Sequence, residues 1–407
     1  MNLKLPQYSN ALKGTIKITG SKSESNRLLI LQQFYKNLQI ENLGESDDTA
    51  VMKKALFSDE KVVDVHHAGT AMRFLTAYFS IVEGRETVLT GSKRMKERPI
   101  QLLVDALRSL GAEIKYMEND GFPPIKIIGK KLTNDKVTIN GNVSSQYISA
   151  LLLIASSLEN GLQLKFEGEV TSVPYIKMTL SLLSELGIEN SWEENTITVK
   201  PKKQLEDNIV TVESDWSSAS YYYSLVALSE DAEITLNAYK KNSLQGDSVL
   251  AEIYQKLGVE TEFGKDFITL TKLKNFNPSP FAHNLQNAPD IAQTIAVTCF
   301  GLNISCGLSG LHTLKIKETD RLVALKTELE KFGAIVRITE DSLHLKSTSV
   351  IKEEVLVKTY NDHRMAMAFA PLLLKTSLEI EDAEVVSKSY PEFWKDIQKL
   401  TNTNLIL

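Results

Sequence analysis

Five consecutive residues late in the chain, KETDR at 317–321, combine two cations with two carboxylates. From Leu322 onward the apolar residues follow a helical pattern, so the charges lie where a helix begins. Ion pairs in a solvated first turn would explain such a stretch. The alternative is a site in which Lys317 and Arg321 bind an anion while Glu318 transfers a proton. Which interpretation holds depends on the helices and strands that position these residues.

The composition is that of an ordinary globular protein, with 407 residues, 43% hydrophobic residues and 24% charged residues. Because single cores stop growing near ~250–300 residues, we expect two or more domains. A net charge of −5 gives no basic field, so nucleic acid and anionic membranes are not expected partners. Two cysteines cannot form a disulfide framework. The start of the chain lacks the apolar core of a signal peptide, and we expect a cytoplasmic protein.

An amphipathic helix followed by glycine and a short strand recurs at intervals of roughly 75 residues. Glycine directly after a helix usually adopts the left-handed conformation that ends the helix. Two further copies of this pattern lack the glycine. The glycines of the four clear copies are Gly111, Gly187, Gly258 and Gly333.

A second unit alternates with the first and consists of a strand, a polar loop and a helix that is apolar nearly all round. A helix without a polar face must be buried, whereas the glycine-ended helices have one polar side and belong outside. The pattern predicts an α/β fold with six buried and six covering helices, in two similar domains of three units each. The six polar loops are marked by Ser23, Thr70, Ser145, Ser217, Asp290 and His363.

Eight motifs in these loops resemble those of the EPSP synthase (3-phosphoshikimate 1-carboxyvinyltransferase) family, over essentially the full length. In chain order they are GSKSESNR, AGTAMR, RMKERPI, SSQYISALL, QGD, PDIAQT, KETDRL and NDHRMAM. The resemblance implies two inside-out α/β barrel domains, each with three βαβαββ units and parallel buried helices. We expect one domain to comprise residues 1–20 and 214–407 and the other residues 21–213, with the active site in the cleft between them.

The resemblance also implies an activity. Members transfer the enolpyruvyl group of phosphoenolpyruvate to the 5-hydroxyl of shikimate 3-phosphate and release phosphate, a step toward chorismate and the aromatic amino acids. No metal or organic cofactor is implied, and we expect a monomer. The implied reaction is addition followed by elimination, with Asp290 or Lys22 accepting the hydroxyl proton and Glu318 supplying the proton to C3.

The family's substrate contacts map onto individual positions of this sequence. The expected contacts with shikimate 3-phosphate are Lys22, Ser23, Arg27, Ser144, Ser145, Gln146, Ser172, Asp290 and Lys317. The expected contacts with phosphoenolpyruvate are Lys22, Gly69, Arg98, Gln146, Arg321, Arg364 and Lys388.

Some of these residues also have purely structural interpretations. Ser23 and Asp290 stand where helices begin and could be N-caps, and Asp320 is expected to cap or to form a local ion pair. His67 replaces a residue that is usually Asn in the family, and Thr313 replaces one that is often Asn, so the sequence departs from the family pattern at two positions expected to contact ligands.

Two rival functions fit parts of this pattern. An enolpyruvyl transferase acting on UDP-N-acetylglucosamine usually carries a reactive cysteine in the loop that corresponds to GSKRMKERPI, and this loop has none. A non-catalytic binding protein with six repeats would explain the repeats but not six cations expected around two carboxylates. The KETDR and NDHRMAM motifs favour the shikimate branch.

Overall fold

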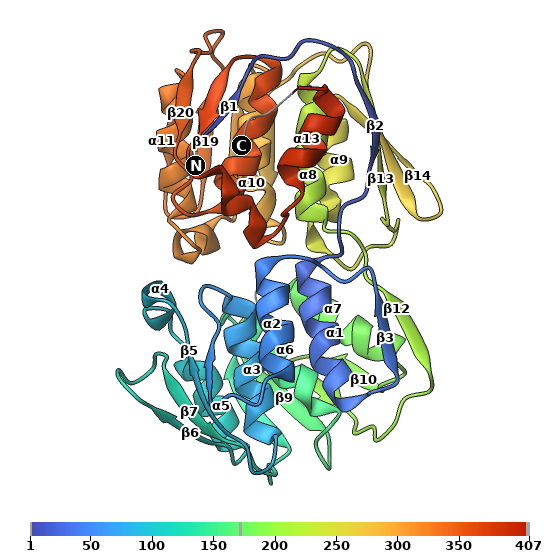
Figure 1. Cartoon of the computed structure of the whole chain (residues 1–407), viewed down its shortest axis with the longest axis vertical. Helices are drawn as coiled ribbons and strands as arrows, with labels where there is room; N and C mark the ends of the chain where they lie inside the picture. Colours follow the sequence, from blue (N-terminus) through green and yellow to red (C-terminus); the bar gives the residue numbers. More distant parts are fainter. Residues whose placement is uncertain (1, 171–172, 404–407) are drawn as a thin grey trace. The chain divides into compact units, whose positions relative to one another are not determined.

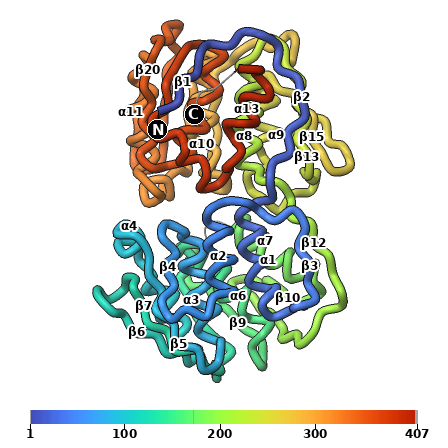
Figure 2. Tube along the Cα trace, viewed as in Figure 1, coloured from blue at the N-terminus to red at the C-terminus, as the bar shows by residue number. Residues whose placement is uncertain are grey.

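The computed structural model describes residues 2–170 and 173–403. The chain forms two compact units, shown in Figures 1 and 2. Unit 1 combines the residues up to Gly20 with those from Glu213 onward, and unit 2 comprises Ser21–Val212. Unit 2 is therefore an insertion in the chain of unit 1.

Unit 2 alternates strands with helices along its whole length. Its helices are α1 (Lys22–Phe34), α2 (Asp47–Phe57), α3 (Gly69–Ile81), α4 (Lys93–Lys96), α5 (Gln101–Ser109), α6 (Ser145–Ala155) and α7 (Val173–Glu185). Its strands are β3 (Leu38–Glu41), β4 (Val62–Asp64), β5 (Glu86–Thr90), β6 (Glu113–Tyr116), β7 (Ile125–Ile128), β8 (Lys136–Asn140), β9 (Leu162–Glu167), β10 (Asn190–Glu193), β11 (Thr196–Val199) and β12 (Asn208–Thr211).

Unit 1 repeats this alternation. Its helices are α8 (Trp216–Leu228), α9 (Leu250–Gln255), α10 (Ala292–Gly301), α11 (Arg321–Lys331), α12 (His363–Phe369) and α13 (Phe393–Thr401). Its strands are β1 (Leu3–Leu5), β2 (Leu12–Ile16), β13 (Ala232–Asn237), β14 (Val259–Phe263), β15 (Phe267–Lys272), β16 (Phe281–Asn284), β17 (Cys306–Ser309), β18 (Ile335–Ile338), β19 (Leu343–Lys346), β20 (Val355–Val357) and β21 (Leu378–Ile380).

Four sheets share one topology, in which two parallel strands are followed by an antiparallel pair. Their orders are β4-β5-β7-β6, β8-β9-β11-β10, β16-β17-β19-β18 and β2-β13-β15-β14. In the last of these, Ile16 pairs with Leu236 in parallel register, although all of unit 2 lies between them in sequence. Two smaller sheets, β1-β21-β20 and β12-β3, complete the set among the described residues.

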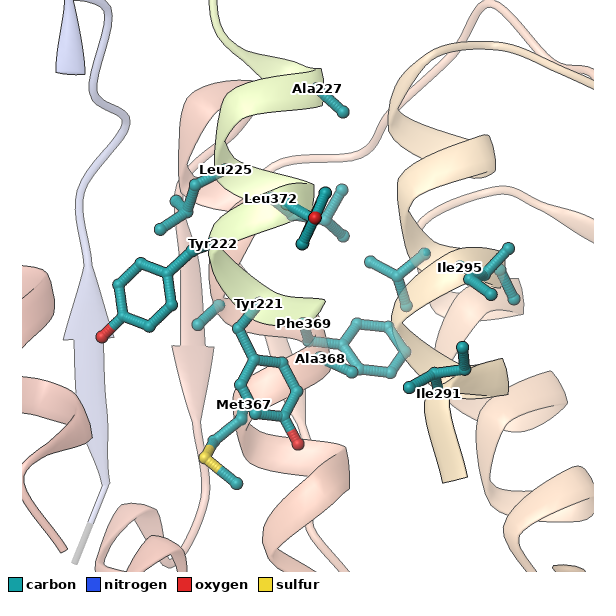
Figure 3. Close-up of a cluster of buried hydrophobic side chains, with 14 of the residues drawn as sticks. Tyr221, Tyr222, Leu225, Ala227, Ile291, Ile295, Met367, Ala368, Phe369 and Leu372 are labelled. Atoms are coloured by element: carbon teal, nitrogen blue, oxygen red, sulfur yellow. The ribbon is translucent and has the colours of Figure 1, made fainter. Parts of the chain in front are cut away.

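The predicted buried helices are α1, α3, α6, α8, α10 and α12. In α8 no residue is charged and all 13 are buried. Figure 3 shows apolar side chains of α8, α10 and α12 meeting in the core of unit 1, with Tyr221, Ile295 and Phe369 among them. The charged residues of α1, α3 and α12 lie near the N-terminal ends of these helices. Where a buried helix carries charge, that charge therefore lies near the start of the helix.

The predicted covering helices are α2, α5, α7, α9, α11 and α13. Helix α5 buries Leu103, Val104 and Leu107 and exposes its other side. The four glycines that follow the clear copies all have positive φ, as the sequence predicts: Gly111 (107°), Gly187 (67°), Gly258 (88°) and Gly333 (101°). The α/β class expected from the sequence is confirmed. The described residues contain the six buried and six covering helices, together with the short helix α4, which the repeat pattern did not predict.

The division of the chain differs from the expected one by a single residue, because Glu213 belongs to unit 1. Its carboxylate accepts hydrogen bonds from the Trp216 indole, the Lys240 amide and the Ser243 hydroxyl, all in that unit. In the described part of the chain, no helix is long and apolar enough to cross a membrane.

The helix-ending glycines give a test within unit 1. Gly333→Ala places a Cβ no nearer than 3.4 Å to other atoms, so its cost is the left-handed conformation, roughly 1–2 kcal/mol. Gly258→Ala adds a contact of 2.7 Å with the Phe276 ring. We expect Gly333→Ala to lower the melting temperature by several degrees, at about 2–4 °C per kcal/mol, and Gly258→Ala to lower it further. Calorimetry measures both, and equal melting temperatures for the two variants would show that the ring contact adds no cost.

Candidate active site

Asp290 is the centre of a charged cluster in unit 1. It lies in a 3₁₀ turn, Pro289–Ile291, directly before α10, and its side chain is 13% exposed. Its Oδ1 is 2.8 Å from Arg321 Nη1 and 3.4 Å from Lys317 Nζ, while its Oδ2 is 3.4 Å from Arg364 Nη2. The N-cap positions of the turn and of α10 belong to other residues. The capping interpretation of Asp290 is therefore wrong, and its carboxylate instead gathers three cations.

Arg321 opens α11 and is almost fully buried, with 2% of its side chain exposed. Besides Asp290, its guanidinium donates to Asp362 Oδ2 (2.6 Å) and to Glu318 Oε2 (2.8 Å). Burial by itself lowers its pKa, but the carboxylates of Asp362, Glu318 and Asp290 outweigh that effect and raise the pKa above its ordinary value. Arg321 therefore stays charged and joins three separate segments.

The charges of the KETDR stretch divide between local and distant partners. Asp320 is the N-cap of α11 and accepts from the amides of Leu322 and Val323, as expected. Glu318 and Arg321 form an ion pair three residues apart, as a simple first turn would. However, Arg321 is buried and reaches distant carboxylates, so the solvated-turn interpretation is wrong for this residue.

Arg364 is held by a chain of contacts that the sequence did not reveal. Its guanidinium donates to the Asp290 carbonyl (3.2 Å) and to Ser217 Oγ (3.2 Å). The Ser217 hydroxyl in turn donates to Asp247 Oδ2. Burial, reinforced by the charge of Asp290, raises the pKa of Asp247 to about 7. In the sequence, the only sign of this chain of contacts is the QGD motif, which contains Asp247.

Lys388 lies at the end of a 3₁₀ turn, Ala383–Lys388, and its ammonium donates to the Asn361 carbonyl at 2.5 Å. Asp362, the neighbour of Asn361, is fully buried and is the N-cap of α12, accepting from the Arg364 amide. The cations expected at 317, 321 and 364 thus all contact Asp290, while Lys388 contacts the segment that leads into α12.

Unit 2 brings a second group of cations to the start of α3. A Cβ on Gly69 would lie 2.6 Å from Nη1 of Arg98, so only glycine lets this guanidinium pack against the helix start. Arg73, one turn along, is buried and donates to the carbonyls of Gly69 (3.2 Å) and Pro99 (3.1 Å). Burial and the nearby charge of Arg98 lower the pKa of Arg73 to about 10. The two guanidinium groups repel each other.

Arg27 is buried in unit 2 and bonded to neutral groups. It donates to the hydroxyls of Thr179 (2.8 Å) and Ser149 (3.0 Å) and to the carbonyls of Ser23 (2.7 Å) and Tyr175 (3.3 Å). Burial lowers its pKa to about 10. Its side chain thereby joins α1, α6 and α7, a structural role that its charge alone did not suggest.

The remaining unit 2 candidates lie at helix starts. Lys22 is 3.4 Å from the Asp48 carboxylate. Ser21, rather than Ser23, holds the N-cap position of α1, so the capping interpretation of Ser23 is wrong. Ser144 caps α6 by accepting from the Gln146 amide (3.4 Å).

The Gln146 side chain donates to Thr70 Oγ1 (3.2 Å), which joins the starts of α6 and α3. Ser145 is buried beside it, with 8% of its surface exposed. His67, the departure from the family pattern, pairs its Nδ1 with the Ser92 hydroxyl at 2.8 Å. Ser172 lies outside the described residues.

Comparison with known proteins identifies relatives along nearly the whole chain. The family model for EPSP synthase (3-phosphoshikimate 1-carboxyvinyltransferase) matches residues 33–397. A 3-phosphoshikimate 1-carboxyvinyltransferase of Bacteroides fragilis (strain YCH46) is 47% identical over 392 residues, which cover 95% of each chain. The enzyme of that name from Haemophilus influenzae (strain PittEE) is 36% identical, over 96% of this chain and 97% of its own.

Solved structures show the same fold. An EPSP synthase structure from Acinetobacter baumannii superposes with a TM-score of 0.82 at 21% identity, over 99% of this chain and 98% of its own. The enolpyruvyl transferase NikO from Streptomyces tendae superposes with a TM-score of 0.72 at 14% identity, over 98% and 97%. These likenesses establish the fold, while the family match and the sequence relatives establish the lineage. The chain belongs to the EPSP synthase (3-phosphoshikimate 1-carboxyvinyltransferase) family.

Proposed function

We propose that this chain transfers the enolpyruvyl group of phosphoenolpyruvate to the 5-hydroxyl of shikimate 3-phosphate and releases phosphate. Family membership supports the activity. The observation that carries it to this chain is the cluster around Asp290, where a carboxylate meets Lys317, Arg321 and Arg364. In such an arrangement the carboxylate can accept the proton that the hydroxyl group loses, and the cations can bind an anionic substrate.

We propose further that each unit is an inside-out α/β barrel and that the active site is the cleft between the two domains. In each unit, three sheets accompany three buried helices, and the charged residues that α1, α3 and α12 carry lie near the N-terminal ends of these helices. Helix N-termini carry roughly +0.5 charge each before screening and leave amide groups free for anions. Two such ends facing each other would suit two phosphorylated substrates.

Shikimate 3-phosphate is assigned to residues from both units. Its phosphate and hydroxyl groups would be bound by the set Lys22, Ser23, Arg27, Ser144, Ser145, Gln146, Ser172, Asp290 and Lys317. Within this set, Arg27 acts mainly by fixing the α1 start that carries Lys22 and Ser23, since its guanidinium already makes four hydrogen bonds to protein.

Phosphoenolpyruvate is assigned to Lys22, Gly69, Arg98, Gln146, Arg321, Arg364 and Lys388. Gly69 contributes by leaving room for the Arg98 guanidinium, whose planar fork can bind a carboxylate or phosphate with two hydrogen bonds. Arg98 and Arg73 repel each other, so an anion beside Arg98 gains additional stabilisation.

The reaction proceeds by addition and then elimination. The 5-hydroxyl transfers its proton toward Asp290 or Lys22, and its oxygen attacks C2 of phosphoenolpyruvate while C3 takes a proton from Glu318. The tetrahedral adduct then loses phosphate from C2 while a proton returns from C3 to the Glu318 carboxylate, which restores the double bond. The cations stabilise the charge that develops on the oxygen and phosphate groups.

The contact between Glu318 and Arg321 couples binding to proton transfer. Glu318 Oε2 accepts from Arg321 Nη2 at 2.8 Å, a position that an anionic substrate group could occupy instead. A protonated Glu318 is neutral and competes poorly for the guanidinium. Binding of phosphoenolpyruvate to Arg321 therefore favours the form of Glu318 that can donate a proton to C3.

The alternative acceptor substrate is UDP-N-acetylglucosamine. The NikO likeness supports only the shared fold, and no cysteine stands in the loop GSKRMKERPI, so this alternative is less supported.

Phosphate release decides between the two acceptors. The purified chain should release phosphate from phosphoenolpyruvate when shikimate 3-phosphate is present and not when UDP-N-acetylglucosamine replaces it. Calorimetry should show tighter binding of phosphoenolpyruvate in the presence of shikimate 3-phosphate. Phosphate release from phosphoenolpyruvate with UDP-N-acetylglucosamine but not with shikimate 3-phosphate would overturn the proposal. Binding of the substrates without any phosphate release would indicate a non-catalytic binding protein.

Glu318→Gln tests the proton-transfer residue. Glutamine keeps the size and can still accept from Arg321, so the variant should fold, but kcat should fall by ~10²–10⁴ because it cannot give a proton to C3. Glu330→Gln, an exposed position on α11 that pairs with Lys326, is the matched control and should keep full activity. Near-normal kcat in Glu318→Gln would remove this residue from the mechanism.

The cleft has its own test. Cations of both units would repel each other across an empty cleft, and the dianionic phosphate and the carboxylate of shikimate 3-phosphate would offset that repulsion. We expect shikimate 3-phosphate to reduce the radius of gyration measured by small-angle scattering, and shikimate to do so poorly. If an active enzyme shows no change in radius, the closure proposal is wrong.

A further inference from the structure

The segment between β20 and α12 contains two consecutive residues in a strained conformation. Tyr360 has φ of 54° and Asn361 has φ of 55°, both in the left-handed region. A bulky residue such as tyrosine rarely adopts it, and such strain persists only where the surroundings enforce it. Asp362 follows directly, and its amide closes a turn onto the Thr359 carbonyl at 2.8 Å.

The surroundings that enforce this turn centre on Glu328, in the middle of α11. Its side chain is fully buried. Its Oε1 accepts from the Tyr360 hydroxyl at 2.6 Å, and its Oε2 accepts from the Lys358 amide at 3.0 Å and from the Lys331 ammonium at 2.5 Å. Lys331 also donates to the Leu356 carbonyl at 3.0 Å. The second half of α11 thus holds the segment from residue 356 to residue 360.

The first residue of the same helix holds the other end of the segment. Arg321 and Glu328 are seven positions apart, about two helical turns, and so lie on one face of α11. Arg321 binds Asp362, and Glu328 binds Tyr360. The strained residues therefore lie between a buried cation and a buried anion on one helix.

This segment adjoins the cations assigned to phosphoenolpyruvate. The Asp362 carboxylate accepts hydrogen bonds from the Arg321 guanidinium and the Arg364 amide, and the Asn361 carbonyl accepts one from the Lys388 ammonium. A shift of the strained turn would therefore move the groups that orient Arg321, Arg364 and Lys388 together.

We propose that Glu328 and Tyr360 are positioning residues, a clamp that holds the strained turn so that Arg321, Arg364 and Lys388 keep the arrangement that binds phosphoenolpyruvate. The assignment to phosphoenolpyruvate rests on the proposed function, whereas the clamp itself does not. Neither residue touches substrate in this proposal. Their effect passes through Asp362 and Asn361.

Tyr360→Phe tests the clamp by removing a single hydroxyl. A hydrogen bond to a charged acceptor commonly corresponds to about a tenfold change in an equilibrium constant. We expect KM for phosphoenolpyruvate to rise about tenfold, with KM for shikimate 3-phosphate and kcat changed by less than about twofold. Tyr223→Phe is the matched control, because it removes a buried hydroxyl that pairs with Thr261 of β14 in the same unit. The control should leave both KM values unchanged, whatever its effect on stability.

A second measurement, hydrogen exchange, tests the clamp without an activity assay. Hydrogen exchange of the Asp362 amide should become about tenfold faster in Tyr360→Phe and stay unchanged in Tyr223→Phe. Glu328→Gln removes the charge of the acceptor and should act in the same direction as Tyr360→Phe. The double variant should lose less than the two single effects combined, because both changes weaken the contact between residues 328 and 360.

Each outcome has a separate meaning. Unchanged exchange at Asp362, or an equal rise of both KM values in Tyr360→Phe, would overturn the clamp. If the wild-type chain releases no phosphate from its two substrates, the proposed function falls, and the exchange experiment still decides whether Glu328 and Tyr360 hold the turn.

Discussion

Burial of the Arg321 guanidinium is the constraint on which the candidate site in unit 1 depends. An arginine that is 2% exposed must be paired, since leaving an uncompensated charge inside a protein costs about 3–5 kcal/mol. Its three carboxylate partners come from different segments, the turn before α10, the entry to α11 and the N-cap of α12. One side chain therefore fixes the mutual positions of three loops that are well separated in sequence.

The pairing with Arg321 also distinguishes the carboxylates of the site by how deeply they are buried. Asp362 is fully buried and serves Arg321 and the first turn of α12, so it is unavailable to substrate. Asp290 and Glu318 are partly exposed, at 13% and 30%, as their proposed roles in proton transfer require. Burial thus divides chemically identical groups into a structural one and two that can react.

The helices were predictable because their signal is local. A buried helix is apolar nearly all round, and a glycine usually follows a helix that ends in the left-handed conformation. Both features are visible in one stretch of sequence. The partners of charged residues were not predictable in this way. Asp247, Asp362 and Glu328 act through residues that tertiary structure brings to them, and a sequence without coordinates does not show which ones.

The sequence also grouped together cations whose environments differ. Lys317, Arg321 and Arg364 face the Asp290 carboxylate. Arg27 and Arg73 bond instead to hydroxyl, carbonyl and thioether groups, and burial lowers the pKa of each to about 10. The cluster around Asp290 therefore pairs its cations with carboxylates, whereas the start of α3 in unit 2 keeps Arg73 close to the like charge of Arg98. An anion bound against Arg98 would relieve that repulsion, so the like charges at the start of α3 favour a phosphate or carboxylate ligand there.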